Sequence, residues 1–389
     1  MSNHSVNRRN FIKLSAAASA ALALNHATIQ AKPAIRENKI PERTLGRTNI
    51  QLPILSMGVM RADNPSVVRA AYNSGIIHFD TANGYQNGKN EEMLGTFFSG
   101  KPRDSYILAT KVKQNLGDDA VEKFLEQFET SMKRLKMDHV DILYFHALSK
   151  PEEVNYAPIV EAMVKLKKDG RTKYIGLSTH SNEPAVINAA VDNGNYDVIL
   201  TSYNFNQKHL SELNPAIERA VKANLGIVAM KTMAGGYLDR ERTQKVNTKA
   251  ALKWALQNPN IHTAIPGFTS FEELEECLDS AANLEMDQEE KNFLSVTANQ
   301  TLLYCQGCRN CIDQCSKNLP IPDMMRAYMY NYGYKSPQLA QEVITGLQLA
   351  ENPCGDCAAC TVRCTGGFQV AEKIKDINRL RNVSKDFLV

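Results

Sequence analysis

Four titratable side chains stand at the ends of three successive strand-like segments, where they could transfer a proton. They are Asp80, Tyr85, Lys111 and His146. A free tyrosine titrates at about pH 10, and an ammonium group within hydrogen-bond reach in a dry pocket lowers that value. Taken one by one, such residues are more often structural: a rim tyrosine, a buried ion pair, a core histidine. Their joint position at strand ends indicates an acid–base site.

Eight of the nine cysteines fall into two runs near the C-terminus, CQGCRNCIDQC and CGDCAACTVRC. Both have the spacing Cys-x2-Cys-x2-Cys-x3-Cys, which bacterial-type ferredoxins use for cubane [4Fe–4S] clusters. In that pattern three closely spaced thiolates wrap one cube, and the fourth cysteine commonly ligates the other cluster. The expected ligand sets are Cys305, Cys308, Cys311 and Cys364 for one cluster, and Cys354, Cys357, Cys360 and Cys315 for the other.

Two other uses of these thiols fit the spacing less well. A structural zinc ion favours two Cys-x-x-Cys pairs about a dozen or more residues apart, which leaves the third cysteine of each run without a role. Disulfides are expected in an exported protein, but repeated two-residue spacing is a poor framework for them. Ser316 and Thr365 stand where a proline usually follows the fourth cysteine. The ninth cysteine, Cys277, is expected to be a buried apolar residue of a helix.

Residues 1–31 have the order of an export signal, with a basic start, an apolar centre and a small-residue end. Arg8 and Arg9 precede the letters NFIK and an Ala-rich stretch, which resembles a twin-arginine signal cleaved after Ala27 or Ala31. This route carries folded proteins, so clusters can be inserted before the thiols reach an oxidising space. The expected destination is the periplasm. The alternatives are an amphipathic helix of the mature domain and a cytoplasmic enzyme.

Composition excludes two classes of partner. The chain is 43% hydrophobic and 22% charged, as in soluble globular proteins. Its formal net charge is +3 and it has no block of basic residues, so a nucleic acid partner is not expected. No uninterrupted apolar run approaches the roughly 20 residues that a membrane span requires.

The elements that must position the acid–base residues are eight short apolar segments that alternate with helical patterns. The segments are 53–58, 75–81, 105–112, 141–147, 173–179, 197–203, 226–232 and 262–268. They are near-continuous apolar runs, as expected for strands buried on both faces of a parallel sheet. The alternation predicts an α/β fold, a (β/α)8 TIM barrel. A doubly wound sheet is the alternative, but its GxGxxG fingerprint is absent after the first strand.

The stretch that joins the two cysteine runs has a different pattern. Residues 323–332 and 336–350 have the pattern of short helices, and the second begins with Ser336 as an N-cap. We therefore expect residues 300–389 to form a small α-helical ferredoxin-like iron–sulfur domain. It is similar to the helical ferredoxin modules of multi-subunit reductases.

Residues 41–299 resemble the aldo-keto reductase family. The resemblance lies in HFDTANGYQNG, ILATKV and DILYFHAL, in this order, after RTLGRTNIQLPILSMG, which is similar to the family's N-terminal hairpin and first strand. In that family a tyrosine protonates a carbonyl oxygen while a nicotinamide delivers hydride. The resemblance implies that Tyr85 is the acid, that Lys111 lowers its pKa, that Asp80 holds Lys111, and that His146 orients or polarises the carbonyl.

The same resemblance implies an NAD(P) site at the ends of the later strands. The family holds the adenine ribose and its phosphate at the last strand-to-helix loop, where helix amides suit an anion. Glu273 stands where arginine or glutamine is common, so both NAD and NADP stay open. Met230 replaces the usual stacking tyrosine, and Leu200 replaces a glutamine. The candidate cofactor-binding residues are Ser178, Asn204, Met230, Lys231, Gly267, Thr269, Ser270 and Glu276.

Together these features predict an exported oxidoreductase that interconverts a small carbonyl and an alcohol with NAD(P). The two [4Fe–4S] clusters would pass electrons to a redox protein partner, or would be structural. A hydride carries two electrons and a cubane moves one, and no intermediate such as flavin is evident between them. The alternative is a non-catalytic redox sensor or electron-transfer docking subunit that has retained the barrel.

Overall fold

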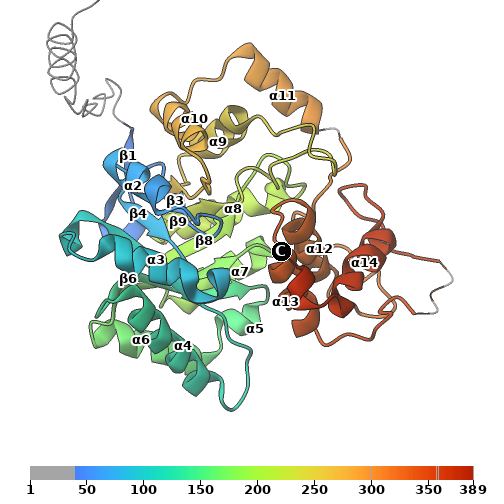
Figure 1. The fold of residues 1–389 in the computed structure, drawn as a ribbon, viewed down its shortest axis with the longest axis horizontal. Helices are drawn as coiled ribbons and strands as arrows, with labels where there is room; N and C mark the ends of the chain where they lie inside the picture. The colour runs from blue at the N-terminus through green and yellow to red at the C-terminus, as the bar shows by residue number, and fades with distance from the viewer. Residues whose placement is uncertain (1–39, 299, 356, 358, 389) are drawn as a thin grey trace, which may run out of the picture. The chain divides into compact units, whose positions relative to one another are not determined.

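Eight parallel strands form a nearly closed barrel in the computed structural model, which describes residues 40–298, 300–355, 357 and 359–388 (Figure 1). In chain order the strands are β3 (Met57–Gly58), β4 (His78–Asp80), β5 (Ile107–Val112), β6 (Val140–Leu148), β7 (Thr172–Thr179), β8 (Val198–Ser202), β9 (Gly226–Met230) and β10 (Thr263–Ala264). Each pairs in parallel with the next. A parallel bridge between Leu55 and Ala264 connects the two edges of the sheet. The predicted barrel is confirmed, while the predicted export signal lies outside the described residues.

Each of the eight predicted segments overlaps a strand of this sheet. The first strand is shorter than predicted because Pro53 belongs to a separate hairpin. In that hairpin β1 (Glu42–Thr44) pairs antiparallel with β2 (Gln51–Pro53). The last strand ends early, just before Ile265 and Pro266, and proline has no N–H to donate to a sheet.

Helices follow the strands and cover the outside of the barrel (Figure 1). They are α2 (Pro65–Asn73), α3 (Lys89–Phe98), α4 (Ala120–Leu135), α5 (Pro151–Val154), α6 (Ala157–Lys168), α7 (Glu183–Asn193), α8 (Leu210–Lys222), α9 (Thr248–Gln257), α10 (Phe271–Ala282) and α11 (Gln288–Ala298). Helix α4 shows why the sequence folds this way. Its apolar residues recur at helical spacing, so Phe124, Phe128 and Met132 are buried together against the sheet.

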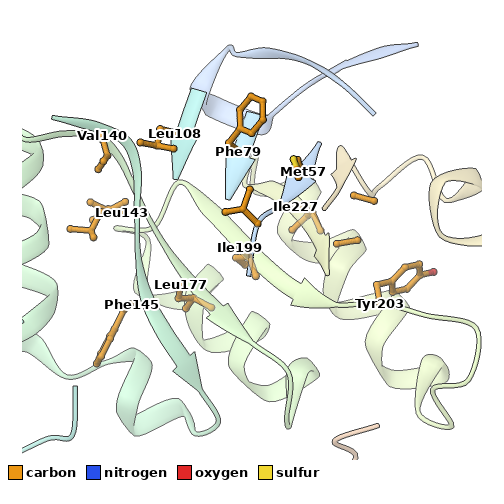
Figure 2. Packing of buried hydrophobic residues seen from close by; sticks show 14 of the residues in the cluster. Met57, Phe79, Leu108, Val140, Leu143, Phe145, Leu177, Ile199, Tyr203 and Ile227 are labelled. Atoms are coloured by element: carbon orange, nitrogen blue, oxygen red, sulfur yellow. The ribbon is translucent and has the colours of Figure 1, made fainter. Parts of the chain in front are cut away.

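Alternate residues of the strands divide the apolar core into two parts. Outward-facing residues such as Phe79, Leu143 and Ile199 pack in the large cluster under the helices (Figure 2). Their neighbours in sequence, such as Ile142 and Leu200, belong to a smaller cluster in the barrel interior. This period of two explains why the strands are apolar at nearly every position.

The C-terminal segment, residues 300–388, has a hydrophobic core of its own. Its helices are α12 (Ile321–Tyr332), α13 (Pro337–Gly346) and α14 (Val370–Asn378). The first two agree with the helices predicted from the sequence, whereas the third was not predicted. The segment packs against the barrel, and the chain from Ile40 onward is one compact unit. No helix in the described ranges is long and apolar enough to cross a membrane.

Candidate active site

The ends of β4, β5 and β6 bring the four predicted acid–base residues together. Lys111 Nζ lies 2.5 Å from Asp80 Oδ1, 2.6 Å from the carbonyl oxygen of Thr81 and 3.4 Å from the hydroxyl oxygen of Tyr85. The rings of Tyr85 and His146 meet edge to face, with centroids 6.0 Å apart. The strand ends supply three of these side chains, and Tyr85 begins the 3-10 turn that follows β4.

Lys111 is held mainly by Asp80. The two side chains are 1% and 2% exposed, so they form a buried ion pair. Burial raises the pKa of the Asp80 carboxyl and lowers that of the Lys111 ammonium, while their mutual attraction opposes both shifts. The second carboxylate oxygen of Asp80 has no hydrogen-bond partner among the described residues. It is therefore free to accept a hydrogen bond from a group in the cavity that Asp80 lines.

Tyr85 keeps its proton more firmly than the sequence predicts. Burial raises the pKa of its hydroxyl well above the usual value, and the charges of Asp80, Tyr330 and Tyr334 act in the same direction. The sequence predicts the opposite shift, caused by Lys111. The difference arises mainly from burial of the phenol, and Lys111, which is paired with Asp80 at 2.5 Å, reaches the Tyr85 oxygen only over 3.4 Å. A neutral Tyr85 at pH 7 suits proton donation to a carbonyl oxygen.

Two histidines face the same space as Tyr85. His146 ends in the cavity from β6, and His180 directly follows β7. Burial lowers the pKa of both imidazoles well below the usual value, and the charges of neighbouring lysines and of Arg326 lower it further. Both rings are therefore neutral at pH 7, and each can donate one N–H and accept one hydrogen bond.

A single cavity runs from these residues across the carboxyl ends of the later strands. At one end it is lined by Asp80, Tyr85 and His146. At the other it reaches Gly267 and Glu273, at the start of α10. The end of β9 and the loop that follows it, residues 230–233 and 235–237, also line the cavity. The lining therefore includes both the acid–base residues and the start of a helix, where the amides can hold a phosphate of a dinucleotide.

Three of the predicted cofactor-binding residues line this cavity: Met230, Lys231 and Gly267. Lys231 adopts a left-handed backbone conformation with φ 57°, which is uncommon for lysine. Burial lowers the pKa of its ammonium to about 7, and the charge of Arg326 is the next largest cause. Thr232, its neighbour, has a buried hydroxyl with no hydrogen-bond partner in the described part of the chain. That hydroxyl is available to a ligand.

The other five predicted cofactor residues are engaged by the protein itself. Ser178 Oγ accepts a hydrogen bond from the Ala147 amide, 2.8 Å away. Asn204 Nδ2 donates to Gln306 Oε1 over 2.9 Å. In the α10 region, Thr269 donates to Glu273, Ser270 caps the helix, and Glu276 faces Lys245 at 3.6 Å. Thr269 lines a second, neighbouring cavity instead.

The start of α10 already carries a negative charge. The Glu273 carboxylate accepts hydrogen bonds from the Thr269 amide and hydroxyl at 2.8 and 2.9 Å. Glu272 adds a second acid to the first turn. These carboxylates complement the helix dipole in the way a bound phosphate otherwise would. Cys277, predicted to be a buried apolar residue, is 2% exposed and lines the cavity behind Glu273.

The C-terminal segment supplies part of the cavity wall. Tyr330 on α12, and Gly333 and Tyr334 just beyond it, line the same cavity as Asp80, Tyr85 and His146. Lys231 Nζ lies 5.9 Å from the centre of the Tyr330 ring, and Arg61 lies over the ring of Tyr334. Sequence reasoning missed these tyrosines. The sequence gives no signal for them, because nothing in it says which face of α12 and of the turn after it meets the barrel.

The first cysteine run is fitted closely to the ends of β7 and β8. Gly307 has φ 77°, and a Cβ on it would meet the carbonyl oxygen of His180 at 2.4 Å. Its own carbonyl accepts a hydrogen bond from the Asn182 amide over 3.0 Å. Only glycine fits this conformation and this close approach. This contact places Cys305 near Lys231, and the charge of the Cys305 thiolate acts to raise the pKa of Lys231.

The eight clustered cysteines form two groups in space. Burial, together with the nearby thiols of Cys308, Cys311 and Cys364, raises the pKa of Cys305 to about 12. Burial likewise raises the pKa of Cys354, and its nearby thiols are Cys357, Cys360 and Cys315. The Gly307 and Gly366 amides each donate to a cysteine sulfur over 3.3 Å. The grouping pairs each run's first three cysteines with the fourth of the other run.

Within the described ranges, no group of three or more His, Cys, Asp or Glu side chains is arranged to hold a single metal ion. A cubane cluster makes a different geometric demand, since each thiolate binds a separate iron at its own corner of the cube. In a cubane site the sulfur ligands therefore lie farther apart than the ligands of a single metal ion. Amide donation to sulfur is one of the interactions that tune such clusters.

Comparison with known proteins identifies the class of this protein. Residues 51–250 match the model of the aldo/keto reductase family, and the chain belongs to that family. It is an oxidoreductase, as the reductases and dehydrogenases among its relatives indicate. Residues 5–24 match the twin-arginine translocation signal, which confirms the predicted export signal.

Among its relatives, L-galactose dehydrogenase of Arabidopsis thaliana is 28% identical over 298 residues, which cover 64% of this chain and 92% of the relative. Methylglyoxal reductase DkgB of Escherichia coli O157:H7 is 27% identical over 275 residues, covering 66% and 97%. The holo form of an aldo-keto reductase from Bacillus halodurans has the same fold, with a TM-score of 0.57 and 21% identity. That match covers 67% of this chain and 97% of the other.

Proposed function

We propose that the barrel reduces a small carbonyl compound, or oxidises the corresponding alcohol, with a nicotinamide dinucleotide. The observation that carries this proposal is the single cavity that joins Asp80, Tyr85 and His146 to the start of α10. The family typically uses NAD(P)H, and the free Thr232 hydroxyl in the cavity wall fits such a group. When bound, a nicotinamide supplies or accepts a hydride.

The chain's own residues would handle the proton and the orientation of the substrate. Tyr85 donates its hydroxyl proton to the carbonyl oxygen, and its raised pKa keeps that proton in place at pH 7. The neutral His146 presents an N–H beside Tyr85 and orients the same oxygen. Lys111 contacts the Tyr85 oxygen and stabilises the negative charge that develops there. Asp80 keeps that ammonium in position.

The start of α10 favours NAD over NADP. The family's adenosine end is expected at this helix, where the carboxylate of Glu273 is fixed by two hydrogen bonds from Thr269. A 2′-phosphate placed there would face that carboxylate, whereas a ribose hydroxyl can donate a hydrogen bond to it. We therefore expect the 2′-hydroxyl cofactor to bind more tightly.

The C-terminal segment is proposed to hold two [4Fe–4S] clusters that exchange single electrons with a redox partner. The support is the spacing of the cysteines and their division into two groups, one around Cys305 and one around Cys354. Cys357 and Cys360 are exposed, so the group around Cys354 is the one open to a partner. The twin-arginine signal supports export as a folded protein, with the periplasm as the proposed destination.

The test of the reductase function uses full-length protein purified without oxygen. Oxidation of NADH and NADPH is measured with a panel of small aldehydes and ketones. We expect Tyr85→Phe to lower kcat/KM by about 10²- to 10⁴-fold, because it removes the proton donor. Tyr156→Phe is the control, since that hydroxyl is bonded to the Gly117 carbonyl at the surface. Absence of nicotinamide-linked turnover in the wild type would leave the redox-subunit alternative, and survival of turnover in Tyr85→Phe would show that Tyr85 is not the proton donor.

A further inference from the structure

Positive charge gathers at the end of the cavity where the reaction is proposed to occur. Lys231 and His180 line the cavity beside His146. Arg326, on α12, places Nη1 3.4 Å from His180 Nδ1 and 3.5 Å from His180 Nε2. The positive charges of Lys231, Arg326 and Lys113 all act to lower the pKa of His146. Two parts of the chain, the strand ends and α12, therefore bring several cations to one place.

The nearby carboxylates do not balance this charge. Asp80 is occupied by Lys111 at 2.5 Å, and Asp323 pairs with Arg326 at 2.7 Å. The charge of Glu183 acts to raise the pKa of Lys231, but the two residues form no ion pair. The Glu183 carboxylate instead accepts hydrogen bonds from Ser202 and Gln207 and lies 3.1 Å from His209 Nε2.

Lys231 has no carboxylate partner among the described residues. Its ammonium forms no ion pair and no hydrogen bond with them and contacts the face of the Tyr330 ring, while the Cys305 thiol is near enough to raise its pKa. An ammonium removed from water and left unpaired is costly, and a bound anion removes that cost. The arrangement is therefore that of a receptor for a negatively charged group.

We propose that the substrate of this site carries an anionic group, a carboxylate or a phosphate, which Lys231 binds with Arg326 and His180 beside it. This inference rests on the proposed reductase function and names its substrate class. The carbonyl would face Tyr85 and His146, and the anion would lie toward α12. Tyr330 and Tyr334 would form the wall of the pocket against which the carbon skeleton packs.

The anion belongs to the substrate rather than to the dinucleotide because of its place in the cavity. Lys231 and His180 lie at the same end as His146 and Tyr330. Two other basic residues line the cavity: Lys245 pairs with Glu276 of α10 at 3.6 Å, and Arg242 lies over the ring of Tyr237. A pyrophosphate can use these two residues and does not require Lys231.

The first experiment measures binding without turnover. Oxamate and inorganic phosphate serve as probes in calorimetric titrations of full-length protein, one for a carboxylate and one for a phosphate. We expect one of them to bind the wild type and Tyr85→Phe, and to bind Lys231→Met about tenfold or more weakly. Lys249→Met, which removes an exposed lysine of α9, is the matched control and should bind as the wild type does. Methionine is unbranched like lysine, so the strained backbone at position 231 is left as it is.

The second experiment measures the preference for anionic over neutral carbonyl substrates. Glyoxylate is compared with methylglyoxal, and glyceraldehyde 3-phosphate with glyceraldehyde, as the ratio of kcat/KM within each pair. Lys231→Met should lower the anionic-to-neutral ratio in one pair, and Lys231→Arg should restore part of it because the charge returns.

The outcomes separate this inference from the reductase function. Probe binding that depends on Lys231 in a protein without turnover supports the anion site and rejects the reductase. Turnover with unchanged ratios in Lys231→Met overturns the anion site and keeps the reductase. If Lys231→Met shifts the reduction potential of a cluster but leaves probe binding unchanged, Lys231 serves the group around Cys305, and the proposal is wrong.

Discussion

Lys111 Nζ lies 2.5 Å from Asp80 Oδ1, and this pair is almost completely shielded from water. The ammonium group is thereby fixed at the end of β5, from which it reaches the Tyr85 hydroxyl only over 3.4 Å. The pair is thus both a part of the proposed site and a buried charge network within the fold.

Breaking this pair should destabilise the protein strongly. Lys111→Met leaves the Asp80 carboxylate buried without its partner, and we expect a loss of about 3–5 kcal/mol in the free energy of unfolding. The double variant Asp80→Asn with Lys111→Met should recover part of that loss, since no unpaired charge remains. Lys165→Met, in an exposed pair with Asp169, is the control and should cost about 1 kcal/mol or less. Equal losses at the two sites in denaturant unfolding would contradict the interpretation.

His78 should make stability depend on pH. Burial lowers the pKa of its imidazole to about 4, from about 6.5 in an unfolded chain. The unfolded state therefore binds the proton first, so this contribution is complete above pH 6.5 and is lost as the pH falls toward 4. The loss is about 1.4 kcal/mol per pH unit in that window.

The measurement compares urea unfolding of the wild type and His78→Asn at pH 7.5 and 5.5. Asparagine can keep a hydrogen bond to Ser56, the partner of His78 at 3.1 Å. The other histidines contribute equally to both proteins and cancel in the difference. The variant should lose less stability on acidification, and the same loss in both proteins would show that His78 is not the cause.

Glu273 should set the choice between the two nicotinamide dinucleotides. Glu273→Gln removes the negative charge at the start of α10 but keeps an oxygen that can accept the hydrogen bonds from Thr269. We expect the ratio of kcat/KM for NADPH over NADH to rise by about tenfold, the equivalent of about 1.4 kcal/mol. Glu275→Gln, on the same helix, controls for the change in net charge. An unchanged ratio would mean that the adenosine end does not lie against Glu273.

The division of the cysteines can be tested cluster by cluster. The wild type should contain about eight irons and eight sulfides, as two [4Fe–4S] clusters require. Replacing Cys364 should disturb the cluster of Cys305, although Cys364 belongs to the second run. Electron paramagnetic resonance of Cys364→Ala and Cys308→Ala should therefore show loss of the same signal. If Cys364→Ala and Cys357→Ala lose the same signal instead, each run binds its own cluster.

Much of the fold could be predicted because the signals are local. Strands buried on both faces are apolar at nearly every position, and helices such as α4 repeat their apolar residues at helical spacing. The third helix of the C-terminal segment is not among the predicted elements, although Val370, Ile374 and Ile377 of α14 recur at helical spacing. Strand ends were less certain, as the separation of β2 from β3 at Pro53 illustrates.

The residues of the candidate site are likewise predictable where the signal is local and unpredictable where it depends on distant contacts. Asp80, Lys111 and His146 follow from the rule that barrel sites lie at strand ends, and His180 obeys that rule although it was overlooked. Tyr330 and Arg326 could not be predicted, because their positions depend on how α12 docks on residues far away in the sequence. The direction of the Tyr85 pKa shift was missed for a related reason, since it depends on burial and on how firmly Asp80 holds Lys111.

The contribution of Tyr330 and Tyr334 to the cavity has a consequence for the order in which the protein is made. The export signal is synthesised first, then the barrel with its acid–base residues, and the tyrosines that complete the cavity leave the ribosome near the end. The export signal is therefore present in the nascent chain before the cavity can form. A transport route that accepts folded proteins is compatible with this order, because the cavity can be completed before export.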